Sequence, residues 1–149
     1  LGKSYYMEKD YNNACECFSK GLSFDLESEL EYVIDMVETY GYAMLNSGAE
    51  KEAMSFVNIY DEFGDSADFK FLMGIIYMKN GLFDNAVKEF KKAVLYKDCK
   101  VEGVNSYQAY YNIGVIYECL GYNDKALEYY ERCGDYENAQ NREAYIKNN

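Results

Sequence analysis

The chain has 149 residues, enough for one domain of ordinary size or a short stack of repeats. It is 49% hydrophobic, with 18 Tyr and 8 Phe, and this apolar surface excludes an intrinsically disordered chain. Proline is absent, so the 11 glycines are the main residues that could interrupt a helix. The composition predicts a nearly all-helical protein.

Charge and hydropathy limit the kinds of partner that the chain is expected to bind. With 26 acidic residues, 15 basic residues and no His, the formal net charge is −11, which opposes binding to nucleic acid or anionic lipid. All of this net charge lies in residues 1–68, which hold 15 acids and 4 bases. There is no apolar run near the ~18 residues of a membrane span and no signal-peptide pattern at the N-terminus. We therefore expect a cytoplasmic protein that binds neither nucleic acid nor membrane.

We expect helices, in chain order, at residues 1–8, 11–23, 27–46, 50–62, 67–79, 83–97, 105–120 and 123–132, followed by a polar helical segment at 135–147. The glycines between paired helices should close the first helix in a left-handed conformation; they are Gly48, Gly81 and Gly121. Polar residues should begin the second helix, among them Asn12, Asp84 and Asp124. Ser66 should cap the helix that follows it.

The eight expected helices form four successive pairs that follow one repeat pattern. In each, a Gly is followed twelve residues later by an Ala, giving Gly2 and Ala14, Gly41 and Ala53, Gly74 and Ala86, and Gly114 and Ala126. Sixteen residues after the Gly stands a large apolar side chain, in order Phe18, Val57, Phe90 and Tyr130. This pattern predicts helical hairpins in which the Gly and the Ala face each other at a close approach and large residues fill the space around the contacts.

The stretches at 110–121 and 124–130 resemble the tetratricopeptide repeat pattern almost column for column. The resemblance implies an all-α, right-handed solenoid of antiparallel helical hairpins with a C-terminal capping helix. It implies one domain over 1–149, with an incomplete first repeat at about 1–28, repeats at 34–66, 67–100 and 107–134, and the capping helix at 135–147. Because the first repeat starts inside a helix, we expect the chain to be a fragment of a longer protein.

A second resemblance rests on residues 67–74 and 102–107. These stretches are similar to the repeat tail behind the catalytic domain of some bacterial family 2 glycosyltransferases. In that alternative, the tail would position the substrate or hold the assembly of a parent enzyme whose nucleotide-sugar domain is not in this chain.

The chain itself carries no set of residues suited to catalysis. In the absence of His, only carboxylates and thiols could act, and the five scattered cysteines show no zinc-binding spacing. The acidic run at 61–68 lacks the spacing of a calcium loop. We therefore expect a non-enzymatic protein with no catalytic residue, no metal and no cofactor, whose cysteines are reduced packing residues.

The tetratricopeptide resemblance implies a concave groove lined by the first helix of each hairpin. The residues expected to face it are Asp35, Glu38, Tyr42 and Leu45, then Asp68, Phe71, Ile75 and Met78, and finally Gln108, Tyr111, Val115 and Glu118. A scaffold of this kind would bind a peptide or protein partner through apolar anchors.

The acidic residues of the 27–46 helix suggest that the partner is also basic. Glu27, Glu31, Asp35 and Glu38 fall within about 80° of arc on this helix, beside Tyr42. The alternative is that the acids form only a solvated face and that the apolar groove residues pack on neighbouring helices. Self-association through the incomplete first repeat is a further possibility.

Overall fold

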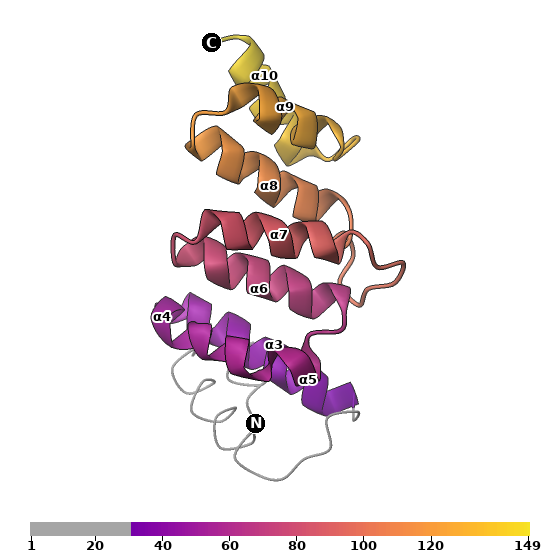
Figure 1. The fold of residues 1–149 in the computed structure, drawn as a ribbon. Coiled ribbons are helices and arrows are strands. Elements are labelled where there is room, and N and C mark those ends of the chain that lie inside the picture. The colour runs from indigo at the N-terminus through magenta and orange to yellow at the C-terminus, as the bar shows by residue number, and fades with distance from the viewer. Residues whose placement is uncertain (1–30) are drawn as a thin grey trace. The chain divides into compact units, whose positions relative to one another are not determined.

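A computed structural model describes residues 31–149, apart from the side chain of Glu31. The helices expected at 1–8 and 11–23, the beginning of the 27–46 helix and the incomplete first repeat lie outside the described residues. Every regular element within residues 31–149 is helical, which confirms the all-α fold class (Figure 1). This part of the chain contains no helix that is both long and apolar enough to span a membrane. It divides into two compact units, with the boundary between Asp65 and Ser66.

The first unit contains α3 (Glu31–Asn46), α4 (Glu50–Ala53), the 3₁₀ helix η1 (Met54–Ile59) and α5 (Tyr60–Phe63). The single helix predicted at 50–62 is therefore wrong, because a 3₁₀ segment interrupts it. The buried apolar residues in the described part of this unit are Val33, Val37, Ala43, Met44, Ala53 and Phe56. The rings of Tyr40 and Phe56 lie 5.9 Å apart and join α3 to η1.

The 3₁₀ segment changes which side chain enters the core. Val57 was expected to fill the hairpin, but it is 44% exposed, whereas Phe56 is 2% exposed. In an α-helix Val57 would lie about one turn beyond the buried Ala53. A 3₁₀ helix has about three residues per turn, so Phe56 takes that place and Val57 turns outward.

The second unit contains α6 (Ala67–Lys79), α7 (Phe83–Ala93), α8 (Tyr107–Cys119), α9 (Asn123–Glu131) and α10 (Glu137–Lys147). Each helix packs against the next one in the chain, so α6–α7 and α8–α9 form two successive hairpins with α10 against α9 (Figure 1). The bounds of α6 agree with the prediction. Helix α7 ends at Ala93, four residues before the predicted end.

The turns confirm most of the expected local signals. Gly48, Gly81 and Gly121 adopt positive φ angles of 84°, 76° and 86°, the left-handed conformation that glycine reaches without strain. The backbone N–H of Phe69 donates to Oγ of Ser66 at 3.0 Å, which confirms the predicted cap. Asp84 and Asp124 do not cap their helices. They lie in the first turn, and the cap positions hold Leu82 and Tyr122 without a side-chain hydrogen bond.

The glycine inside each hairpin of the second unit makes room for an aromatic ring. A Cβ on Gly74 would lie 2.5 Å from the ring of Phe90, and a Cβ on Gly114 would lie 2.5 Å from the ring of Tyr130. The nearest atoms to each glycine are thus those of the aromatic residue sixteen positions later, rather than those of the Ala expected to face it. Ala86 and Ala126 are fully buried in the same hairpins.

Candidate functional site

The first unit holds four of the expected groove residues, all on α3. Asp35, Tyr42 and Leu45 are half-buried, and Glu38 is buried. Their spacing places them on one side of the helix, at about 100° per residue. Glu27 and the side chain of Glu31 lie outside the described residues, so the full acidic stripe stays a prediction.

Asp68 has a different position from the one expected. It is 7% exposed, and its carboxylate accepts hydrogen bonds from the backbone N–H groups of Lys100, at 2.9 Å, and Val101, at 3.0 Å. Both donors lie in the long connection between α7 and α8, which accounts for the wide spacing between these repeats. The structure therefore places Asp68 in the interior, where it holds this connection in position.

Phe71, which was also expected in the groove, belongs to the core of the second unit. It is 6% exposed, and its ring meets that of Phe90 edge-on at 5.3 Å. The same cluster of buried residues includes Ile113 on α8. Ile75 and Met78, one and two turns further along α6, are half-buried against this cluster. They are the members of the α6 set that reach the surface.

The residues expected on α8 lie near the C-terminal helix. Tyr111 is half-buried, with its ring 5.8 Å from that of Tyr130 and perpendicular to that of Tyr136 at 5.4 Å. Val115 packs against the buried cluster formed by Ala126, Tyr130, Cys133 and Ala139. The side chain of Gln108 donates to the backbone carbonyl of Glu102 and so helps to hold the preceding loop.

Glu118 is the centre of a small polar network. The Nε of Arg142, on α10, donates to Oε1 of Glu118 at 3.1 Å, and a second guanidinium nitrogen donates to Oε2. The hydroxyl of Tyr130 donates to Oε1 at 2.8 Å. The hydrogen bond from Arg142 lowers the pKa of Glu118, and that from Tyr130 adds to the effect. Burial, followed by the hydrogen bond to Glu118, raises the pKa of Tyr130.

Arg142 and Tyr145 belong to this site although none of the expected groove residues lies on α10. The guanidinium of Arg142 lies over the ring of Tyr145 at 4.6 Å, and Tyr145 is 55% exposed. The repeat columns contain a signal that could have found Tyr145. Counted from the first residue of each helix, Ile75, Val115 and Tyr145 share one position.

We call the resulting surface the α8–α10 face. It consists of Tyr111, Val115, Glu118, Arg142 and Tyr145, which come from two helices that are not consecutive in the chain. It presents aromatic and aliphatic surface beside a bound pair of opposite charges. Within residues 31–149 no group of His, Cys, Asp and Glu side chains is arranged to hold a metal ion.

Stacked antiparallel hairpins, with a glycine under an aromatic ring in each, define a helical-repeat fold of the tetratricopeptide type. Residues 67–98 and 107–139 match the model of the tetratricopeptide repeat family. The two matches contain the α6–α7 and α8–α9 hairpins, so the repeat resemblance is confirmed for the second unit.

Two solved structures show the same fold. A crystal structure of MamA aligns with a TM-score of 0.73 at 18% identity, over 98% of this chain and 82% of that chain. A second crystal structure of MamA protein aligns with a TM-score of 0.76, also at 18% identity, over 98% of this chain and 76% of that chain. Comparison with curated protein sequences gives no significant match. The resemblance of residues 67–74 and 102–107 to glycosyltransferase tails stays a prediction.

Proposed function

We propose that the chain is a non-catalytic protein-interaction scaffold whose second unit binds a peptide segment or partner domain on the α8–α10 face. The tetratricopeptide repeats and the fold support a scaffold in general. The observation that carries the choice of surface is the exposed Tyr145 under Arg142, whose guanidinium is bound to Glu118 on α8.

The composition of this face suits the recognition of a protein. Tyr and Arg are enriched among the residues that dominate binding energy, because they bury a large area and keep a polar end. The pair formed by Glu118 and Arg142 is held by two hydrogen bonds, so its charges are already oriented before a ligand arrives. A ligand with an apolar anchor and a polar group beside it would match both parts of the surface.

Peptides selected from a display library against the full chain provide the test. Tyr145→Ala should weaken the binding of the selected peptides by about tenfold or more, as expected for an aromatic contact residue. Tyr122→Ala is the matched control, because Tyr122 is equally exposed but lies at the start of α9, outside the α8–α10 face. Equal affinities for Tyr145→Ala and for the unaltered chain would rule out this face as the binding surface.

The acidic residues that favour a basic partner lie in the first unit. Asp35 and Glu38 lie on one side of α3 with Tyr42, and carboxylates beside an aromatic ring favour a ligand that carries Lys or Arg. Reversing the charges with Glu31→Lys and Asp35→Lys should weaken the binding of a basic peptide and reduce its dependence on salt. An unchanged salt dependence would show that the acids are only a solvated face.

Self-association through the segment at residues 1–28 is a separate part of the proposal. Light scattering over a range of protein concentrations tests it. A molecular mass that rises with concentration would support self-association, and a constant monomer mass would contradict it.

A further inference from the structure

Helix α10 repeats the register of the helices that begin the two complete hairpins. The helices α6, α8 and α10 start at Ala67, Tyr107 and Glu137. Their third residues, Phe69, Ala109 and Ala139, are all fully buried. Their eighth residues are all small and are Gly74, Gly114 and Ala144. By this register α10 stands in the place of the first helix of a hairpin.

In the complete hairpins the second helix covers the eighth residue of the first helix. The ring of Phe90 on α7 lies against Gly74, and the ring of Tyr130 on α9 lies against Gly114. The same side of α8 contributes Tyr117, the eleventh residue, which stacks on Tyr129 of α9 at 5.7 Å.

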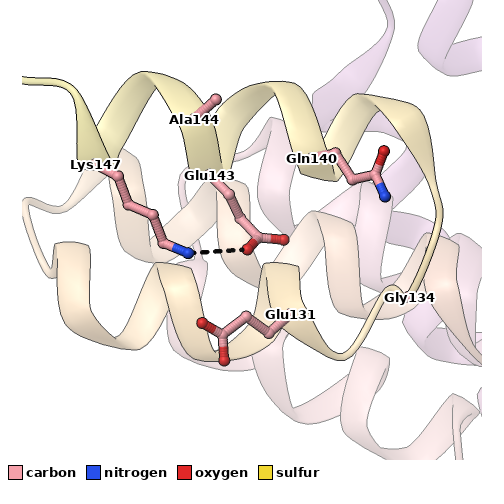
Figure 2. A pocket seen from close by; sticks show the side chains of 6 residues that line it. All are labelled: Glu131, Gly134, Gln140, Glu143, Ala144 and Lys147. Atoms are coloured by element: carbon pink, nitrogen blue, oxygen red, sulfur yellow. Dashed lines mark ion pairs between the residues drawn. The ribbon is translucent and has the colours of Figure 1, made fainter.

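Among residues 31–149, no helix covers the corresponding side of α10. Ala144 is exposed, and so are Gln140 and Lys147, its fourth and eleventh residues. Together with Glu143 they line a pocket of about 440 Å³, whose remaining lining residues, Glu131 and Gly134, come from α9 and the turn that follows it. Figure 2 shows the side chain of Glu131 beneath those of Glu143 and Lys147, with the ion pair drawn between the last two residues.

A contribution from α9 is expected if this pocket is the place of a second helix. The second helices of successive hairpins reach each other through side chains in this unit, since Nζ of Lys91 on α7 lies 5.9 Å from the ring centre of Tyr129 on α9. A helix that covered Ala144 in the same way would also run beside Glu131.

We propose that the pocket seats an amphipathic helix of a protein partner, in the position that α7 holds against α6 and α9 holds against α8. The two existing second helices define the chemistry of this ligand. Each carries a buried Ala and, four residues later, the aromatic ring that covers the glycine. Because Glu143 is paired with Lys147 at 3.7 Å, the carboxylate of Glu131 is the one that favours Lys or Arg beside that anchor. This site uses a different side of α10 from Tyr145 and goes beyond the proposed function.

The chain itself supplies a suitable probe. A synthetic peptide with the sequence of residues 82–95 contains Ala86, the aromatic Phe90 and three lysines. Titrated into the isotopically labelled full-length chain, it should give saturable chemical-shift changes at the amides of Gln140, Ala144 and Lys147. The Phe90→Ala version of the peptide should bind about tenfold more weakly or worse, because the anchor ring is lost.

Substitutions in the protein complete the test. Ala144→Arg should weaken binding of the 82–95 peptide by about tenfold or more, since a long charged side chain then occupies the pocket. Asn141→Arg is the matched control, because it places the same exposed charge on α10 outside the pocket and should leave the affinity unchanged. Circular dichroism checks that both variants keep their helix content.

The outcomes separate this site from the α8–α10 face. Tyr145→Ala should leave the affinity for the 82–95 peptide unchanged, whereas it should weaken the binding of peptides selected on the α8–α10 face. Failure of the peptide to saturate at millimolar concentration would overturn the proposal. Binding that is insensitive to Ala144→Arg, or equal for the Phe90→Ala peptide, would also overturn it.

Discussion

Tyr130 links the interior of the second hairpin to the α8–α10 face. Its ring lies against Gly114, and its hydroxyl donates to Oε1 of Glu118 at 2.8 Å. Because Glu118 also binds Arg142, one buried aromatic residue supports both the close packing of the hairpin and the charged pair on its surface.

Gly114→Ala should destabilise the chain by about 1–3 kcal/mol, because the new Cβ would lie 2.5 Å from the ring of Tyr130. The sign of the change in the free energy of unfolding is informative, since Ala in the middle of a helix is favoured over Gly by about 1 kcal/mol when there is no clash. Urea denaturation measures the change. Asn141→Ala, an exposed helical substitution, is the control and should shift the midpoint little. A stabilised Gly114→Ala variant would contradict the observed packing.

The network of Glu118 should contribute to acid sensitivity. Its folded-state pKa lies below the ordinary value of 4.5, so the network stabilises the folded chain above that value. This contribution is lost as the pH falls through the lowered pKa. Glu118→Gln should therefore reduce the free energy of unfolding near neutral pH. In acid, the free energies of unfolding of this variant and of the unaltered chain should become more similar. Urea denaturation of both chains at about pH 7 and about pH 3 tests this prediction. An equal difference in the free energy of unfolding at the two pH values would contradict it.

Removal of the buried Asp68 carboxylate should loosen the connection between α7 and α8. Asp68→Ala leaves the backbone N–H groups of Lys100 and Val101 without their charged acceptor, at a cost of about 1–3 kcal/mol. Hydrogen exchange should accelerate at these two amides. Asp98→Ala, an exposed change in the same connection, is the matched control. Unaltered exchange at Lys100 and Val101 in the Asp68 variant would show that these bonds do not protect the loop.

The cysteines of the second unit should differ strongly in reactivity. Burial raises the pKa of the Cys133 thiol to about 12, whereas Cys119 is exposed. Thiolate is the reactive form, so Cys133 should resist alkylation in the folded chain and Cys119 should react readily. Mass spectrometry of peptides after timed alkylation measures both rates. In denaturant the rates should become similar, and equal rates in the folded chain would refute the burial of Cys133.

The same shift predicts a loss of stability in alkali. The folded-state pKa of Cys133 lies above its ordinary value of 9.0, so folding favours the protonated thiol. The free energy of unfolding should therefore fall as the pH rises from about 9 towards 12. Cys133→Ala should show a weaker fall over this interval in urea denaturation. An identical pH dependence in this variant would contradict the prediction.

The sequence alone was sufficient for features that depend on neighbouring residues. The left-handed turns at Gly81 and Gly121 and the cap at Ser66 were predicted because backbone freedom and a nearby hydroxyl act within a few residues. The repeated spacing also placed Gly74, Ala86 and Phe90 in one hairpin, although the ring of Phe90 rather than Ala86 lies against the glycine. The sequence therefore determined the fold class and the two hairpins of the second unit.

Tertiary contacts decided the rest, because they join residues that no local pattern connects. The 3₁₀ turn that exchanges Phe56 for Val57 depends on packing within the first unit, and Asp68 binds a backbone N–H 33 residues away. Glu118 and Arg142 are 24 residues apart, and the sequence shows each only as an isolated charge on a helix. The packing of α10 against the rest of its unit brings these charges together, and the same packing leaves Ala144 open beside α9.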